Sequence, residues 1–296
     1  MTRAISRQFP DGRLHLQDGP IDLIVEAFGP ADQITCAYRA AEQRFATILD
    51  ELCAELLLLR AEAGTAARPN GTAAQRMLDA VLPYAAYGFI TPMAAVAGSV
   101  AEEILGAMIS AARLSRAYAN NGGDIALHLA SGQHFAIGMI DRPDRPSLFG
   151  KAEIAAADDI RGIATSGRHG RSFSLGIADA VTVLAASAAA ADAAATVIAN
   201  AVDLPDHPGI TRLPATHFDP QSDLGGRLVT VAVAPLSDAE TERALSYGIF
   251  VAQELRETGL IAAAALHLNG QTKLVGADRD LPRNHITRQE VLHAVG

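Results

Sequence analysis

Residues 162–203, GIATSGRHGRSFSLGIADAVTVLAASAAAADAAATVIANAVD, form the stretch that decides the fold of this chain. Its first residues favour a short β-strand that ends at Ser166-Gly167, a pair typical of a turn. After a basic loop at 168–171 comes a long Ala-rich run with almost no charge, and this composition predicts a buried helix with Asp179 at its start. We therefore expect a strand, a polar loop and a core helix, in that order.

Asp192 and Thr196 lie four residues apart in this predicted helix, so their side chains share one face. A buried carboxylate without a partner is costly, and the sequence offers Asp192 either a metal ion or Arg168. A carboxylate and a hydroxyl that face Arg168 and Arg171 suit a hard cation beside a phosphate, because guanidinium groups match phosphate oxygens in pairs. His169 is the candidate acid or base. A solvated surface turn remains the alternative interpretation of the loop.

A second polar segment, 120–124 (NNGGD), precedes two runs, 125–129 and 135–140, that we expect to pair as a hairpin. Consecutive glycines let the backbone approach a ligand, and successive N–H groups there can bind an anion. An ordinary turn between a helix and a strand explains the same residues. Both interpretations stay open.

The chain resembles the ApbE family over about residues 90–200. In the family's order, the similar segments are 96–103 (its Gly/Ala-rich helix start), 121–125 NGGDI and 135–138 FAIG (its Gly-Gly-Asp hairpin), and 164–167 ATSG, 181–185 VTVLA and 191–196 ADAAAT (its C-terminal half). Members of that family are magnesium-dependent FAD:protein FMN transferases, which attach FMN to a Ser or Thr of a partner protein. The wording SGR-x-GRS-x-SLGIADA is most similar to a separate ApbE-like branch.

The resemblance implies a set of site residues. Mg²⁺ would be held by the backbone carbonyl of Ala97 and by the side chains of Asp192 and Thr196. FAD, or another phosphorylated cofactor, would be bound by Gly122, Gly123, Asp124, Thr165, Ser166 and Gly167. The catalytic candidates are Arg168, His169 and Arg171.

Two departures from the family separate the possible functions. The His-x-x-Asp-Pro-x-Thr-Gly segment of the transferases is missing, and Gly98 and Ser99 stand where a Lys is expected. Retention of the metal-binding pair favours an FMN transferase-like enzyme, whereas loss of the transfer segment favours a non-catalytic flavin- or nucleotide-binding protein that assists cofactor assembly or redox-enzyme maturation. Whether the chain catalyses transfer stays open, and a scaffold protein is the third alternative.

Composition limits the partners and the compartment. The 296 residues carry a net charge of −9, which argues against general nucleic-acid binding. Cys36 and Cys53 lie 17 residues apart in one predicted helix, too far to pair, so we expect buried free thiols and a cytoplasmic protein. No signal peptide is visible, and charged residues interrupt the Ala-rich run, so we expect no membrane partner. The expected partners are a phosphorylated small molecule, a protein acceptor and a second copy in a homodimer.

The predicted fold class is α+β, with antiparallel sheets packed against long apolar helices. Apolar residues recur every three or four positions over 31–62, and strands are expected at 13–17, 21–28 and 227–234. We expect one ApbE-like domain over 1–296, made of two packed halves at about 1–150 and 151–296. Two segments of the chain share the same order of elements: a helix, a glycine-containing turn and a hairpin. This shared order is compatible with an internal duplication.

Overall fold

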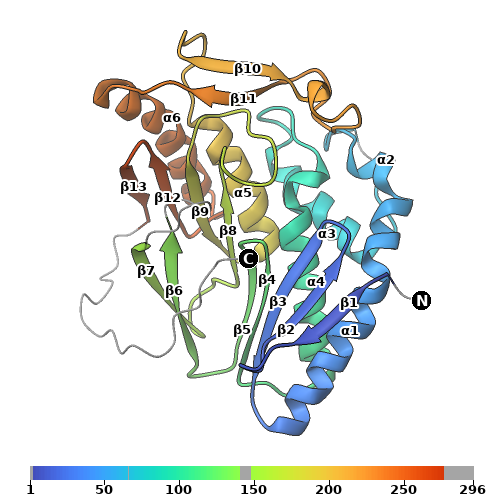
Figure 1. Ribbon diagram of the computed structural model, residues 1–296. Coiled ribbons are helices and arrows are strands. Elements are labelled where there is room, and N and C mark those ends of the chain that lie inside the picture. The colour runs from blue at the N-terminus through green and yellow to red at the C-terminus, as the bar shows by residue number, and fades with distance from the viewer. Residues whose placement is uncertain (1–2, 66, 141–147, 277–296) are drawn as a thin grey trace.

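A computed structural model describes residues 3–65, 67–140 and 148–276 of the chain. Within these residues nine strands form one sheet in the order β1-β2-β3-β4-β5-β8-β9-β12-β13, and every pairing in it is antiparallel (Figure 1). The strands are β1 Ile5–Gln8, β2 Leu14–Asp18, β3 Ile21–Phe28, β4 Arg116–Asn121, β5 Asp124–Leu129, β8 Gly162–Ser166, β9 Ala180–Ala185, β12 Ala263–Leu268 and β13 Gln271–Val275.

Helices of different lengths pack on one face of this sheet. They are α1 Ala31–Ala54, α2 Leu56–Leu59, α3 Thr72–Val81, α4 Val96–Ala111, α5 Ala188–Ala201 and α6 Asp238–Glu257, with short 3-10 turns η1 Leu82–Tyr84, η2 Pro92–Ala95 and η3 Ala215–His217. Two further pairs of strands stand apart from the main sheet: β6 His134–Ile140 with β7 Leu148–Ala155, and β10 Ile210–Pro214 with β11 Leu228–Val233. In Figure 1 the β10–β11 pair lies above α5.

The alternation of side chains along β4 and β5 explains why both faces are covered. Ala117, Ala119 and Ala126 point into the core beneath α1 and α4, whereas Tyr118 and Leu127 belong to a second cluster that contains Phe135, Ile137 and Ile154 of β6 and β7. Successive residues of a strand face opposite sides, so one hairpin serves two apolar layers. Alanines on the helical side let the helices lie close to the sheet.

These features confirm the predicted fold class of antiparallel sheet and long apolar helices. The hairpin of β2 and β3 and the long helix that begins at Ala31 are where the sequence predicted them. Ser237 and Glu240 form a capping box at the start of α6. The division into halves at about residue 150 and the internal duplication stay predictions.

Three details of the expected secondary structure were wrong. Residues 180–185 are the strand β9 rather than helix, because Val181, Thr182 and Val183 are β-branched and pack well in a sheet buried on both faces. The helix begins only at Ala188, after Ser187 accepts a hydrogen bond from the backbone of Ala190. The run 125–129 pairs with β4 and β8 instead of β6, and the strand β10 at Ile210–Pro214 was not expected.

Two features concern the expected cytoplasmic location: the cysteines and one long apolar helix. Cys36 and Cys53 are free but exposed, which corrects the expectation of buried thiols. The segment Pro92–Ala111 is long and apolar enough to cross a membrane by length and composition alone, but core helices of soluble proteins pass the same test. Its Gly98, Val100 and Ile104 are buried within the fold, so we interpret it as a core helix. Cytoplasmic location and the absence of a membrane partner stay predictions.

Candidate functional site

The N-termini of α4 and α5 meet at a contact that requires glycine. A Cβ atom on Gly98 would lie 2.3 Å from the backbone oxygen of Ala188, so no other residue fits without moving a helix. The backbone N–H of Gly98 donates to Asp192 Oδ2 at 3.0 Å, and that of Ala189 donates to Glu102 Oε1 at 2.7 Å. Each helix therefore supplies the carboxylate that caps the other, satisfying N–H groups that a helix start leaves unpaired.

The turn between β4 and β5 lies against this junction. Gly122 and Gly123 have φ angles of 66° and 110°, a region that side chains disfavour, and the N–H of Gly123 donates to Asn120 Oδ1 at 2.8 Å. The Asn121 side chain donates to the carbonyl oxygen of Ala97 at 3.2 Å, which ties the turn to the start of α4. The predicted polar segment is thus a β-hairpin turn joined to a helix N-terminus.

Asp124 brings a second carboxylate to Asp192. Burial and the nearby charge of Asp192 raise the pKa of Asp124 well above its usual range, although the Thr165 N–H donates to Asp124 Oδ1 at 3.2 Å. Burial raises the pKa of Asp192 to about 7, against the opposing effect of backbone N–H groups of Gly98 and Ala97. Two carboxylates that resist simultaneous ionisation are typical of a site that gains stability from a cation. Within residues 3–65, 67–140 and 148–276 neither forms an ion pair with Lys or Arg.

The donor set at this junction fits a hard divalent cation such as Mg²⁺. The described part of the chain contains no cluster of three or more His, Cys, Asp or Glu side chains suited to a metal. Asp124 and Asp192 would therefore be completed by neutral oxygens, which Mg²⁺ accepts together with water. The carbonyl of Ala97 lies at the junction, and Thr196 follows Asp192 by one turn of α5. Asp124, predicted as a cofactor contact, thus becomes a fourth candidate metal ligand beside Ala97, Asp192 and Thr196.

Arg171 places a positive charge over the hairpin turn. Its guanidinium carbon lies 3.6 Å from the position that a Cβ atom on Gly122 would take. Arg171 is exposed, and no carboxylate pairs with it among the residues that the structure describes. An exposed guanidinium over this turn can bind the oxygens of an anionic ligand.

The side chains of Arg168 and His169 contact Asp179 rather than Asp192. Arg168 donates to Asp179 Oδ1 through Nε at 2.9 Å and through Nη2 at 2.6 Å, and His169 Nε2 lies 3.1 Å from the same oxygen. Arg168 is therefore the partner of Asp179 and not of Asp192, which corrects one of the two partners suggested for Asp192. Asp179 precedes β9 rather than starting a helix.

A family model described as "AbpE bacteria" matches residues 6–274. The chain belongs to this ApbE-like family. The match covers all twelve residues predicted for the site, and it confirms the resemblance that the sequence carries.

Curated relatives of this AbpE family chain are UPF0280 proteins of archaea. One from Methanopyrus kandleri is 37% identical over 152 residues, 50% of this chain and 57% of the relative. One from Methanosphaerula palustris is 36% identical over 190 residues, 60% of this chain and 69% of the relative, so the chain also belongs to the UPF0280 family. One from Methanococcus vannielii is 41% identical over 121 residues, 40% and 48% of the two chains. The matches thus span about half to two thirds of these relatives.

Solved structures similar to the AbpE family chain include two flavin transferases. The flavinyl transferase ApbE of Pseudomonas stutzeri, in its apo form, is 11% identical with a TM-score of 0.42 over 92% of this chain and 93% of that one. The flavin transferase ApbE of Vibrio cholerae is 13% identical with a TM-score of 0.40 over 92% and 97%.

The structure gathers some predicted site residues of the AbpE family chain and separates others. Together at the junction lie Ala97, Gly122, Gly123, Asp124, Thr165, Arg171 and Asp192. Thr165 also bonds through its hydroxyl to Thr182 at 2.9 Å, while Ser166 and Gly167 lead from β8 into the loop that holds Arg168 and His169. The assignment of roles to these residues stays a prediction.

Sequence reasoning missed the contacts that Asp179, Gly98 and Asn121 make. Asp179 is buried in an apolar run, and the rule that led us to seek a partner for Asp192 applies to it equally. Gly98 and Asn121 act through close approach and through a backbone contact, for which the sequence alone carries no signal.

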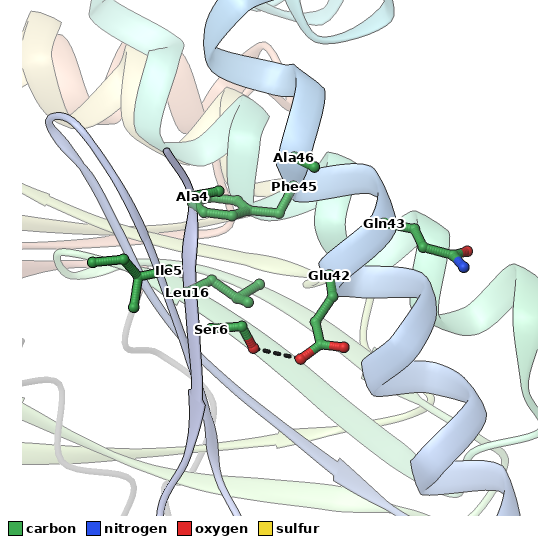
Figure 2. A pocket seen from close by; sticks show the side chains of 8 residues that line it. All are labelled: Ala4, Ile5, Ser6, Leu16, Glu42, Gln43, Phe45 and Ala46. Atoms are coloured by element: carbon green, nitrogen blue, oxygen red, sulfur yellow. Dashed lines mark hydrogen bonds between the residues drawn. The ribbon is translucent and has the colours of Figure 1, made fainter. Parts of the chain in front are cut away.

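A separate hollow of about 280 Å³ lies between β1 and α1. Figure 2 shows its lining, where the Ser6 hydroxyl on the strand donates to the Glu42 carboxylate on the helix. Apolar side chains such as Leu16 and Phe45 form its floor. None of the candidate site residues lines this hollow, and we assign it no chemistry.

Proposed function

We propose that this protein binds FAD, or a related phosphorylated cofactor, together with Mg²⁺, and that it transfers FMN to an acceptor. The observation that carries the proposal is the pair of carboxylates, Asp124 and Asp192, at a helix N-terminus with no internal cationic partner in the described residues. Membership of the ApbE-like family supports the choice of a flavin.

Each part of the site has a distinct task in this proposal. Asp124, Asp192, the Ala97 carbonyl and Thr196 would hold the cation, which supplies charge neutralisation for a pyrophosphate. Arg171 binds phosphate oxygens from above the hairpin turn. The turn at Gly122-Gly123 allows the ligand to approach the backbone because the two glycines carry no side chain of their own.

A non-catalytic flavin- or nucleotide-binding protein is the second candidate. It is favoured by the absence of a His-x-x-Asp-Pro-x-Thr-Gly segment from a chain that keeps the cation-binding groups. Such a protein would assist cofactor assembly or the maturation of a redox enzyme. A cytoplasmic location, a protein acceptor and a homodimer belong to the proposal in either form.

A thermal-shift titration with FAD, FMN and ADP, each with and without Mg²⁺, tests the binding. A ligand that binds the folded chain raises the melting temperature according to its concentration relative to Kd. We expect an FAD shift that requires Mg²⁺ and is lost in Asp192→Asn. Asp159→Asn removes the same charge from an exposed position and should keep the shift.

Release of AMP from FAD separates the two candidates. Chromatographic detection of AMP and FMN, dependent on Mg²⁺ and on Asp192, supports transfer chemistry. Binding of FAD without AMP release supports the second candidate. The absence of any shift with all three ligands contradicts both.

A further inference from the structure

Glu102 connects three helices at the junction of α4 and α5. Its Oε1 accepts the backbone N–H of Ala189 in α5 at 2.7 Å, and its Oε2 lies 2.9 Å from Nε of Arg76 in α3. The Glu102 side chain is 19% exposed. Because Arg76 binds one carboxylate oxygen, the other is directed at the first turn of α5.

The start of α5 is already capped without Glu102. Ser187 Oγ accepts the N–H of Ala190 at 3.2 Å, and the Ser187 carbonyl oxygen accepts the N–H of Ala191 at 3.0 Å. A serine at this position is enough to begin a helix. A carboxylate from another helix therefore has a different effect, which is to fix where α5 begins relative to α4.

Two points of contact set the direction of α5. Gly98 approaches the backbone of Ala188 so closely that a Cβ atom on it would lie 2.3 Å from the Ala188 oxygen, and this contact fixes the first point. Glu102 follows Gly98 by one turn of α4 and holds Ala189, which fixes the second. Rotation about the first point alone would move Asp192, three residues after Ala189, away from the Gly98 N–H.

We infer that Glu102, oriented by Arg76, is a positioning residue for the proposed cation site. By holding Ala189 it keeps the Asp192 carboxylate beside Asp124. The inference rests on the proposed function, from which it takes the cation. Carboxylates that bind metals depend on the contacts that orient them, and loss of such a contact weakens metal binding about 10- to 100-fold. Glu102 acts through α5 and not as a ligand.

Glu103 offers a matched comparison in the same helix. Its carboxylate accepts hydrogen bonds from Arg76 Nη1 at 2.6 Å, Arg44 Nε at 2.8 Å and the Thr72 hydroxyl at 2.6 Å. Its side chain is 12% exposed, so it is more buried than that of Glu102. In the part of the chain that the structure describes it makes no hydrogen bond to α5. Its removal should therefore destabilise the fold at least as much and leave the start of α5 in place.

Mn²⁺ added alone is the probe, because it prefers the same oxygen ligands as Mg²⁺ and its free ion has a strong EPR signal. We expect Glu102→Ala to raise the Kd for Mn²⁺ about tenfold or more, and Glu103→Ala to change it less than about threefold. Urea denaturation confirms that each variant is folded in the assay. Glu102→Leu removes the same acceptor with a larger side chain, and Glu51→Ala removes another carboxylate that binds Arg44, so each can replace a variant that does not fold.

Glu102→Gln separates the hydrogen bond from the charge. The Gln side chain keeps an oxygen that can accept the Ala189 N–H, and Arg76 keeps Glu103 as a partner. We expect a Kd for Mn²⁺ within about threefold of the wild-type value. A Gln variant that binds as weakly as the Ala variant overturns the inference, because the effect then follows the negative charge and not the position of α5.

The Gly98 N–H reports the same positioning without any metal. It donates to Asp192, so its hydrogen exchange, measured by NMR, becomes faster when that carboxylate moves away. In Glu102→Ala we expect exchange about tenfold faster at Gly98 and unchanged exchange at Ile104, which is buried farther along α4. Equal acceleration at both amides indicates a general loss of stability and overturns the inference.

The outcomes distinguish this inference from the proposed function. Wild-type protein and Glu102→Ala that bind Mn²⁺ with the same Kd overturn the inference and leave the cation site intact. Equal weakening by Glu103→Ala also overturns it, because the loss then follows the ion-pair network as a whole. A wild type that binds no Mn²⁺ overturns the cation site of the proposed function, and exchange at Gly98 then decides by itself whether Glu102 positions Asp192.

Discussion

Asp179 and Asp192 lie in the same segment of the chain but in opposite electrostatic surroundings. Asp179 accepts hydrogen bonds from Arg168 and from the backbone of Asn269, with His169 beside it. Asp192 meets backbone N–H groups and a second carboxylate, Asp124. The first carboxylate is compensated within the chain and stabilises a loop. The second is compensated only in part, and such an arrangement gains stability when a cation binds.

Removal of Asp179 should have the largest effect on stability. In Asp179→Ala the half-buried guanidinium of Arg168 loses its partner and the Asn269 N–H is left unpaired. We expect the free energy of unfolding to fall by about 3–4 kcal/mol in urea denaturation at pH 7. Asp159→Ala, at an exposed position, should change it by less than about 0.5 kcal/mol. A loss below about 1 kcal/mol at Asp179 would remove the contrast between the two carboxylates.

A methyl group at Gly98 should lower the free energy of unfolding slightly less than the removal of Asp179. Gly98→Ala places Cβ against the backbone of Ala188 and pushes α4 from α5, so we expect a loss of about 2–3 kcal/mol in the same assay. Gly106 lies on the same helix, where a Cβ atom would meet no other atom within 4 Å, and Gly106→Ala should stabilise the protein by about 0.5–1 kcal/mol. Equal effects at both positions would contradict the close helix junction.

Asp192→Asn should raise the free energy of unfolding, whereas the two preceding substitutions lower it. The folded-state pKa of about 7 lies above the unfolded value of 3.8, so between these pH values the folded chain binds more protons. The free energy of unfolding of the wild type therefore falls as pH rises from about 4 to 8. Asp192→Asn removes this fall and should be more stable than the wild type by about 2 kcal/mol at pH 8, with little difference at pH 4.

Mg²⁺ provides the control for that prediction. Saturating Mg²⁺ should restore wild-type stability at pH 8 and leave Asp192→Asn unchanged, as measured by urea denaturation at each pH. Because the variant and the wild type share all other titrating groups, the difference between their curves isolates the site. Parallel curves over pH 4–8 would show that Asp192 is compensated as fully as Asp179.

The smallest effect on stability is expected at Arg171. Its exposed guanidinium has no ion pair in the described residues, so Arg171→Ala should change the free energy of unfolding by less than about 0.5 kcal/mol. The same variant should weaken Mg²⁺-dependent FAD binding about tenfold, since a charge-assisted hydrogen bond is lost. Arg168→Ala is the matched comparison, and it should destabilise the fold by about 2 kcal/mol because Asp179 then loses its main partner.

Local rules predicted the parts of the candidate site that depend on nearby residues. The four-residue spacing of Asp192 and Thr196 places both in α5, and the Gly122-Gly123 pair marks a turn with positive φ angles. Both inferences rest on backbone geometry within a few residues. The helix assigned to 180–185 failed because alanine-rich composition was given more weight than the β-branched residues Val181 and Val183, which sheet pairing favours.

By itself, the sequence determined the fold class, the elements with clear periodicity, and the types of side chain available for a cation and a phosphate. The tertiary structure alone decided which of these groups meet. The Gly98 N–H and Asp192 are 94 residues apart in the chain, and the Asn269 N–H and Asp179 are 90 residues apart. Such contacts depend on how strands pair and helices pack over long separations, and a local pattern of residues carries no record of them.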